Sequence, residues 1–321
     1  LQRGAGLSSR ELQNKFGITA KSVQRDIDEL RTYISENYDQ AHVDNIEYSR
    51  VQKSYIWRGR SHILLNEKEI LLIAIILLES RGLTKEELNR ILEKMFLQCT
   101  PEAEAKIKQL IKNEMFYYKA TQNSKPMGEL LWVLMDAKQR QKCLRATYKR
   151  IRNSEYEPVE LMPLGIMFSE MYFYLLAKVV GDLENEVITF RVDRLGECEV
   201  LDRSFRVEYN DRFQEGIFRQ EIQFMSMGKL MNVVFRYSGK SLEAVLDRLA
   251  NAEVLSKDEH GTVIRAKVYE QGAKMWFMTQ AENLEILEPE CFRKSMQESI
   301  EKMLSLYVKQ EDREVNAEDF S

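Results

Sequence analysis

The amino-acid sequence predicts an α+β multidomain protein. Its 321 residues exceed the usual length of one domain, so two to four domains are expected. Apolar residues recur mainly at helical spacing up to about residue 140, alternate from residue 142, and then form a βαββαβ series. The expected parts are a helix-turn-helix with a hairpin (1–60), a helical connector (61–140), a small β-barrel or sandwich (141–210), a C-terminal domain (225–310) and an acidic tail (311–321).

The segment LSSRELQNKFG predicts a short amphipathic helix. Ser8 or Ser9 is the expected N-cap, because a hydroxyl can accept a hydrogen bond from the first turn. Leu12 and Phe16 are four positions apart and share one face. Gly17 is expected to end the helix.

A second helix is predicted directly after this glycine, with Thr19 as its N-cap. Its buried stripe is expected to contain Val23, Ile27, Leu30 and Ile34. Two short helices joined by a glycine-containing turn are typical of a helix-turn-helix. The segment NIEYSRVQKSYIW alternates in two arms and predicts a hairpin, or wing, after the second helix.

The rest of the chain divides by its periodicity. Residues 62–120 predict three helices with a cap or an acidic first turn, and ELLWVLMDAKQRQ predicts one more after the break at TQNSKPMG. Four strand-like segments follow: KCLRATYKR, VELMPLGIMFSE, MYFYLLAKVV and EVITFRVDRLGECEVL. The last part has the βαββαβ order of a ferredoxin-like domain, with a long helix appended.

Charge is distributed unevenly along the chain. The net charge is −4, but the first 25 residues contain five basic side chains and a single acidic one, Glu11. The basic residues are Arg3, Arg10, Lys15, Lys21 and Arg25. A basic first segment on an acidic protein indicates a small surface that faces a polyanion.

Several classes of protein are not expected. The longest apolar run, Ile70–Leu78, is far shorter than the roughly 20 residues that span a bilayer, and no signal-peptide pattern is present, so we expect a cytoplasmic protein without a membrane partner. Four scattered cysteines and three scattered histidines indicate reduced, buried thiols rather than a disulfide framework or a metal site. Without a phosphate-binding loop or a hydrolase motif, we predict no cofactor, no catalytic residues and no enzymatic activity.

The outer face of the second predicted helix carries side chains that can read DNA. Arginine can bond guanine O6 and N7, and glutamine can pair with adenine N6 and N7, whereas a serine hydroxyl suits a phosphate. The predicted DNA-binding residues are Arg10, Lys15, Thr19, Lys21, Ser22, Gln24, Arg25 and Lys53. Composition alone would favour a merely solvated helix face, but the cap, the turn, the hairpin and the basic excess together favour DNA binding.

Four motifs in the expected order resemble the WYL-domain transcriptional regulators. LSSRELQNKFGITAKSVQRDIDELR is similar to the family's helix-turn-helix, and Phe173, Tyr174 and Leu175 replace the tripeptide that names the family. ITFRVDRL and LEILEPECFRKSM resemble two later motifs. The resemblance implies a winged helix-turn-helix, a helical connector, a small Sm/SH3-like β-barrel and a ferredoxin-like C-terminal extension. It also places the family's first helix before residue 1.

The resemblance further implies a basic, aromatic ligand pocket in the barrel. The predicted effector-binding residues are Tyr148, Lys149, Arg150, Tyr172, Tyr174, Arg191 and Arg194. Aromatic rings can stack on bases and guanidinium groups can hold phosphates, so a single-stranded nucleic acid or a nucleotide is the expected effector. In the alternative, Arg191 and Arg194 pair internally with Asp193, Asp202 or Glu199. Strand alternation places the two arginines on one surface only if a bulge or turn intervenes.

These features support a regulator that binds a double-stranded DNA operator as a homodimer and responds to an effector. The expected dimer surface is either the connector or the final helix, whose apolar stripe contains Met296, Ile300, Met303, Leu304 and Tyr307. A second hypothesis is an effector-binding interaction protein whose helix-turn-helix docks onto another protein. A nucleic-acid-processing enzyme is a third and less favoured hypothesis.

Overall fold

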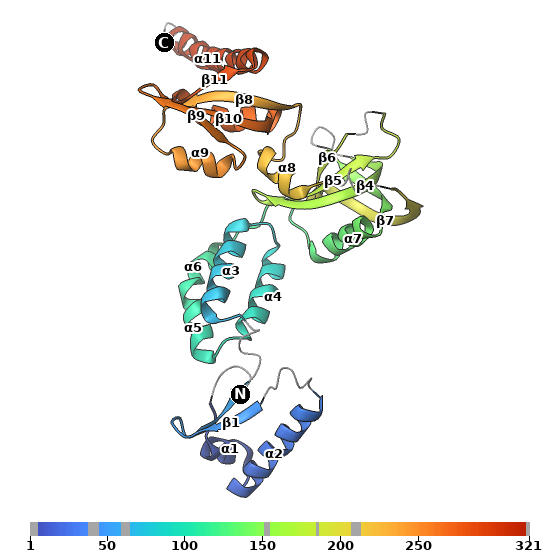
Figure 1. Cartoon of the computed structure of the whole chain (residues 1–321), viewed down its shortest axis with the longest axis vertical. Coiled ribbons are helices and arrows are strands. Elements are labelled where there is room, and N and C mark those ends of the chain that lie inside the picture. The colour runs from blue at the N-terminus through green and yellow to red at the C-terminus, as the bar shows by residue number, and fades with distance from the viewer. Residues whose placement is uncertain are drawn as a thin grey trace. The chain divides into compact units, whose positions relative to one another are not determined.

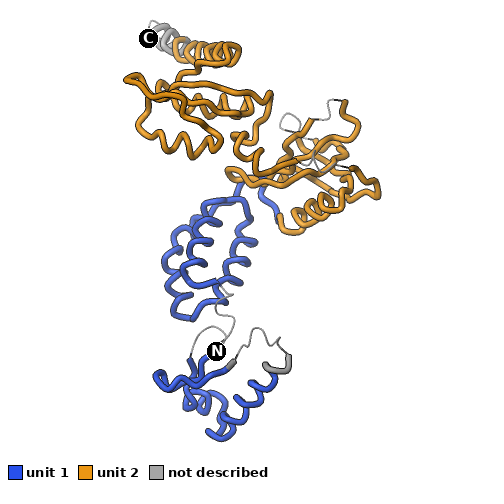
Figure 2. The backbone as a smooth tube through the Cα atoms, viewed as in Figure 1, with its two compact units in different colours: residues 1–126 blue, residues 127–321 orange. Residues whose placement is uncertain are grey.

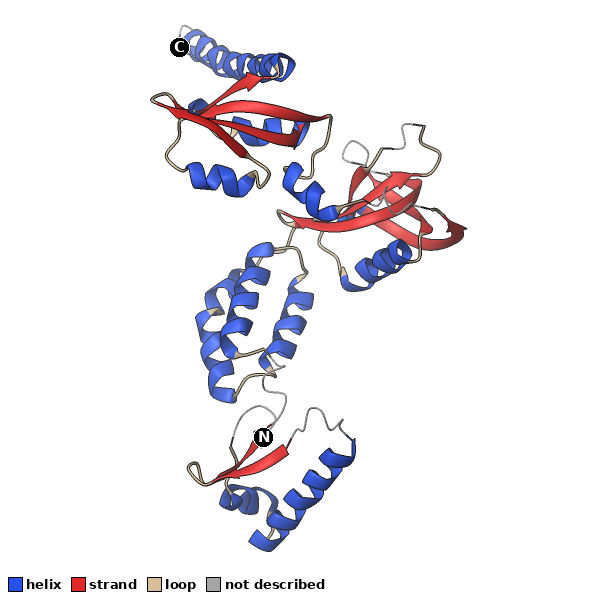
Figure 3. Cartoon of the chain, in the orientation of Figure 1, coloured by secondary structure: helices blue, strands red, loops and turns tan. Residues whose placement is uncertain are grey.

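The computed structural model describes residues 6–37, 45–58, 65–150, 155–183, 186–206 and 213–318 (Figure 1). The chain forms two compact units, Leu1–Pro126 and Met127–Ser321 (Figure 2). Helices predominate in the first unit, and the second unit contains two larger sheets (Figure 3). Among the described residues, no helix combines the length and apolar character required to cross a membrane.

The N-terminal elements are two helices followed by an antiparallel hairpin. They are α1 (Ser9–Phe16), α2 (Ala20–Asn37), β1 (Asn45–Ser49) and β2 (Ser54–Arg58). Ser8 caps α1 in a capping box with Glu11, and Gly17 ends the helix at φ 66°. The hydroxyl of Thr19 accepts a hydrogen bond from the Ser22 amide, as the sequence predicted for the start of α2.

The core beneath the hairpin is smaller than the predicted apolar faces. Val23 and Ile27 are buried, whereas Leu30 is 47% exposed. Phe16, which was expected to share the inner face of α1, is 61% exposed. The buried cluster of this region joins Val23 and Ile27 of α2 to Ile46 and Tyr55 of the hairpin, and neither Leu30 nor Phe16 belongs to it. The Ile34 side chain lies outside the described residues.

The connector contains four described helices instead of the three that were predicted. They are α3 (Glu67–Ser80), α4 (Lys85–Phe96), α5 (Pro101–Leu110) and α6 (Lys112–Tyr117). The third predicted helix is interrupted at Ile111, which adopts φ −101° and ψ 11°. Ile70, Leu88, Phe96 and Ile107 belong to one buried cluster that joins α3, α4 and α5.

The second unit begins with α7 (Gly128–Gln139), which the sequence analysis grouped with the connector. Leu134 and Ala137 of α7 instead share a buried cluster with Leu144 and Leu161 of the following sheet. The strands are β3 (Lys142–Lys149), β4 (Tyr156–Ser169), β5 (Tyr172–Val179), β6 (Ile188–Arg191) and β7 (Leu195–Ser204), in the order β6-β5-β4-β3-β7. Among the described residues β6 and β7 do not pair, so the predicted closed barrel is not found.

After the short helix α8 (Glu215–Glu221), the C-terminal part has the predicted βαββαβ series. Its elements are β8 (Leu230–Tyr237), α9 (Leu242–Arg248), β9 (Glu253–Asp258), β10 (Gly261–Tyr269), α10 (Glu270–Met278) and β11 (Leu284–Glu288). The sheet order β11-β8-β10-β9 confirms the ferredoxin-like arrangement. The final helix α11 (Glu290–Glu318) continues through most of the segment that was expected to be a separate acidic tail.

The cysteines are all thiols, but they are not uniformly buried as expected. Cys99 and Cys143 are buried, Cys198 is half-buried and Cys291 is exposed. Cys291 lies in the first turn of α11, where the neighbouring Phe292 occupies the inner face of the helix.

The placement of α7 on the sheet gives a stability prediction. Leu134 is fully buried and Trp132 is 76% exposed on the same helix. We expect Leu134→Ala to lower the free energy of unfolding by about 2–5 kcal/mol, because it leaves a cavity. Trp132→Ala is the matched control and should change the same quantity by less than about 0.5 kcal/mol. Denaturant unfolding of the full chain measures both, and equal losses would contradict the packing of α7.

Candidate nucleic-acid interface and effector pocket

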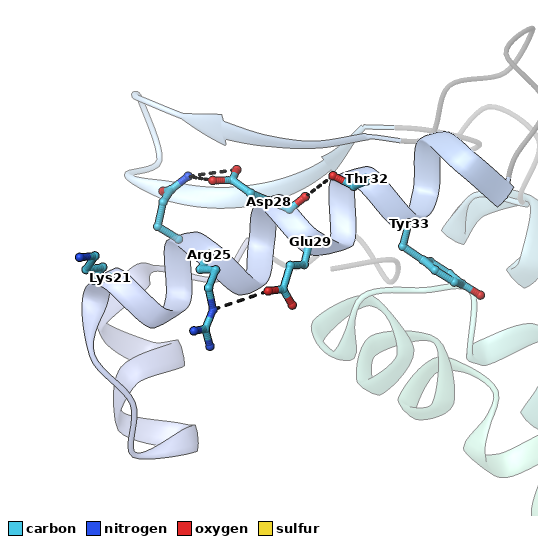
Figure 4. A pocket seen from close by; sticks show the side chains of 7 residues that line it. Lys21, Arg25, Asp28, Glu29, Thr32 and Tyr33 are labelled. Atoms are coloured by element: carbon cyan, nitrogen blue, oxygen red, sulfur yellow. Dashed lines mark hydrogen bonds and ion pairs between the residues drawn. The ribbon is translucent and has the colours of Figure 1, made fainter.

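The basic end of α2 is the first candidate site. Lys21 and Arg25 are one helical turn apart and exposed, and they line one continuous face with Asp28 and Glu29 (Figure 4). This face is therefore basic in the first two turns of α2 and acidic further along. Recognition helices contact base edges mainly through their N-terminal residues. The basic half is the part of α2 that such a contact would use.

Among the described residues, Arg25 forms exposed ion pairs with Asp26 and Glu29. Its guanidinium nitrogens lie 3.5 Å from an Asp26 carboxylate oxygen and 3.6 Å from one of Glu29. The side chains of Arg25 and Glu29 are both 72% exposed. Exposed pairs of this kind contribute at most about 1 kcal/mol. They can therefore open when a stronger anion approaches Arg25.

Both the nitrogen and the oxygen of the Gln24 side-chain amide are hydrogen-bonded within the protein. The nitrogen donates to the two carboxylate oxygens of Asp28 at 3.2 and 3.1 Å, and the carbonyl oxygen accepts from the Tyr55 hydroxyl at 2.9 Å. An adenine would have to compete with both partners, because its pairing with glutamine also uses one amide donor and the carbonyl oxygen. Gln24 therefore links α2 to β2 in this structure.

The other predicted DNA-binding residues lie on α1, at the start of α2 and in the hairpin turn. Arg10, Lys15, Thr19 and Lys53 are exposed, and Ser22 is half-buried. Lys53 lies in the turn of the hairpin at φ 49°. The hydroxyls of Thr19 and Ser22 are 3.0 Å apart.

Arg31, which the sequence analysis missed, forms a second link between α2 and the hairpin. Arg31 donates through Nε to the Ile46 carbonyl of β1 at 2.7 Å, and its Nη1 is 2.8 Å from the Asp28 carboxylate. The pattern offered no signal for this role, because the partner of Arg31 is a backbone carbonyl 15 positions away.

The second candidate site is centred on β5 and β6, where Tyr174 and Arg191 face each other in adjacent strands. The Arg191 guanidinium donates to both carboxylate oxygens of Asp193, at 3.0 Å from Nε and 2.5 Å from Nη2. It also lies 3.4 Å from the centre of the Tyr172 ring. The Arg191 and Asp193 side chains are only 17% and 3% exposed. Part of the structural alternative is thus confirmed, since Arg191 does pair internally with Asp193.

A 3₁₀ turn, Val192–Arg194, interrupts the strand pattern between β6 and β7. It is the intervening turn that strand alternation required, and both Arg191 and Arg194 act on the Tyr174 phenol through their charges. Arg194 is half-buried and forms no ion pair with any residue that the structure describes.

Electrostatics in this cluster favour a neutral phenol beside fixed positive charge. Burial raises the pKa of Tyr174 above its usual value, although Arg191 and Arg194 oppose this shift. Burial also acts to lower the pKa of Arg191, but the hydrogen bonds and charge of Asp193 outweigh it, and the net pKa is raised. At neutral pH, Tyr174 therefore keeps its proton and can donate a hydrogen bond, while Arg191 remains cationic.

The remaining predicted effector residues are placed differently. The Tyr148 hydroxyl accepts from the Arg191 amide at 3.3 Å, so Tyr148 borders the cluster. Tyr148 and Arg150 line a separate cavity of about 550 Å³, where Arg150 is 3.0 Å from Glu157. Lys149 is exposed at the end of β3 and lines no part of that cavity. The structure thus gathers Tyr172, Tyr174, Arg191 and Arg194, and separates them from Lys149 and Arg150.

Comparison with known proteins supports part of the sequence resemblance. The WYL domain family matches residues 129–200. No curated protein matches the chain. Similar solved structures include the proteasome accessory factor B/C (PafBC) of Arthrobacter aurescens, with 16% identity over 94% of this chain and 46% of that chain and a TM-score of 0.32. Another is a CRISPR Cas-related protein, with 15% identity over 68% of this chain and 62% of that chain and a TM-score of 0.39.

The chain spans about half the length of the PafBC protein and under two thirds of the CRISPR Cas-related protein. The family match begins in α7, the helix that packs on the sheet that follows it. It extends through β3, β4, β5 and β6 into β7. Residues 129–200 of this chain therefore match the WYL domain family.

Proposed function

We propose that this protein is a transcriptional regulator that binds double-stranded DNA as a homodimer and whose WYL domain senses an anionic effector. In this proposal α1, α2, β1 and β2 form a winged helix-turn-helix. The observation that carries the proposal is the exposed pair Lys21 and Arg25 at the N-terminal end of a helix whose opposite face is buried under the hairpin.

Several features support DNA as the partner of this helix end. The N-terminus of a helix carries partial positive charge and attracts phosphate, which adds to the charges of Lys21 and Arg25. Lys53 in the hairpin turn and Arg10 and Lys15 on α1 supply exposed cations for backbone phosphates. The weak ion pairs of Arg25 leave its planar group available for the two acceptors of guanine.

The cluster in the WYL domain supports an anionic effector. Asp193 engages two of the five N–H donors of Arg191, and the other donors are not used by that carboxylate. Arg194 adds a second positive charge, and neutral Tyr174 adds a hydrogen-bond donor. A phosphate suits this set, because it accepts several charge-assisted hydrogen bonds at once. We infer a short single-stranded nucleic acid or a nucleotide as the effector, with aromatic side chains available for stacking.

The DNA proposal is tested at Arg25. Arg25→Ala should weaken binding to the preferred operator by about 1–3 kcal/mol and relax its sequence preference, because it removes a base contact. Selection of bound duplexes from a random pool, followed by titration of the best site, measures both effects. Thr32→Ala, two turns further along α2, is the control and should leave affinity unchanged. Equal operator affinity of wild type and Arg25→Ala would refute the role of Arg25.

The effector proposal is tested with Arg194 and Arg191 separately. Arg194→Ala should abolish oligonucleotide binding and leave the melting temperature nearly unchanged, because Arg194 forms no ion pair in the described part of the chain. Arg191→Ala should cost about 3 kcal/mol of stability, because it leaves the buried Asp193 carboxylate without its partner.

In the double variant Arg191→Ala/Asp193→Ala, most of this stability should return while effector binding stays lost. Isothermal titration with short oligonucleotides and nucleotides, together with thermal melts, supplies the data. If wild type binds no anionic ligand under any of these conditions, the cluster is structural only.

The homodimer is tested by light scattering at micromolar concentration. The expected mass is twice the 37.8 kDa of one chain, because two heads bound to a palindrome gain affinity through effective concentration. A mass equal to one chain, with and without operator DNA, would contradict this expectation.

A further inference from the structure

The outward face of α3 is an unusual surface for a connector helix. The inward residues Ile70 and Ala74 are fully buried against the other connector helices. On the opposite side Leu72, Ile75 and Ile76 are 61%, 52% and 59% exposed. Three large aliphatic side chains within five positions of one helix face make a contiguous apolar surface, which marks an interaction site more often than scattered apolar residues do.

The spacing along this face is that of a helix–helix seam. Lys68, Leu72, Ile75 and Glu79 follow one another at steps of four, three and four residues. Such alternating steps keep side chains on one line and are the pattern of a two-helix coiled coil. The seam has apolar residues at its centre, a cation at one end and a carboxylate at the other, and all four side chains are exposed.

This charge arrangement selects one occupant and one orientation. Against an antiparallel copy of itself, Leu72 meets the partner's Ile75, and Lys68 meets the partner's Glu79 at both ends. In a parallel pair, Lys68 would face the partner's Lys68 and the carboxylates would face each other. A surface that complements its own copy is what a two-fold symmetric dimer requires.

We propose that α3 is a dimer contact in which this face packs antiparallel against α3 of a second copy. The inference rests on the proposed homodimer and names its contact surface. It assigns to the connector one of the two surfaces that the sequence analysis left open.

The position of α3 in the chain gives this contact a function. β2 ends at Arg58 and α3 begins at Glu67, so α3 is the first described helix after the hairpin. A contact made at α3 restricts how far apart the two DNA-binding heads can be. The 14-residue helix is about 21 Å long, and a single helix pair of this length buries less than the roughly 1,200 Å² of a standard interface. The contact is therefore weak alone and is strengthened when both heads bind one DNA molecule.

Charge exchange tests the inference in the full chain. Lys68→Glu and Glu79→Lys should each weaken dimerisation about tenfold, because each places like charges together at both ends of the seam. The double variant Lys68→Glu/Glu79→Lys is self-complementary again and should recover wild-type dimerisation. Lys94→Glu on α4 makes the same change in charge on an exposed residue outside the seam and should have no effect. Sedimentation with and without a two-half-site operator gives the dissociation constants, and circular dichroism verifies folding.

A cross-link provides a second measurement that does not depend on charge. In a Cys291→Ser background, a tagged Leu72→Cys chain mixed with an untagged Ile75→Cys chain should form a disulfide-linked heterodimer on oxidation. The inference is overturned if the double charge variant stays as weak as the single variants, or if no heterodimer is linked. It is also overturned if the thiol of the Leu72→Cys variant is inaccessible to a solvent-borne alkylating reagent in the monomeric chain, because the Leu72 side chain would then be covered by its own chain. Dimers of unchanged strength in all variants would reject α3 but retain the homodimer, whereas a monomeric wild type would reject the homodimer itself.

Discussion

The hydrogen bond between Tyr55 and Gln24 connects the hairpin to α2, and the presentation of the basic helix end depends on it. Among the residues that the structure describes, the buried cluster here contains Val23, Ile27, Ile46 and Tyr55, with Leu12 and Ile18 packed against it. Such a small apolar core stabilises a domain poorly. Two hydrogen bonds supplement this apolar core. Tyr55 donates to Gln24 near the start of α2, and Arg31 donates to the Ile46 carbonyl further along the helix. Both hydrogen bonds hold α2, which carries Lys21 and Arg25, against the hairpin.

The region that matches the WYL domain family also depends on polar contacts. Its cluster of Arg191, Asp193 and Tyr172 is mostly buried, so each charge there has to be compensated within the protein. The Asp193 carboxylate compensates Arg191 and fixes the plane of its guanidinium group. The same Arg191 side chain can therefore stabilise the sheet through its ion pair with Asp193 and present a preorganised cation to a phosphate. The structural and functional interpretations of Arg191 are compatible rather than exclusive.

Periodicity predicted most helices and strands because local apolar spacing is sufficient to define them. The caps at Ser8 and Thr19, the hairpin and the βαββαβ series all depend on neighbours within a few residues. The errors occurred where long-range contacts decide. Phe16 and Leu30 had suitable spacing, but no element of the described part of the chain covers them. Helix α7 resembled a connector helix, and only its tertiary contacts with Leu144 and Leu161 assign it to the sheet. The pairing of Gln24 with Tyr55 spans 31 positions, a distance over which sequence spacing carries no information.

The resident carboxylate of Asp193 has a consequence for ligand selection. Any anion that approaches Arg191 meets a site already neutralised by one negative charge. A ligand with a single carboxylate therefore gains little from Arg191 and can pair with Arg194 alone. A ligand with two negative charges can use Arg194 as well, without displacing Asp193. In the proposed effector site, this charge balance would favour phosphorylated compounds, which carry two negative charges, over simple organic acids before any base or sugar is recognised.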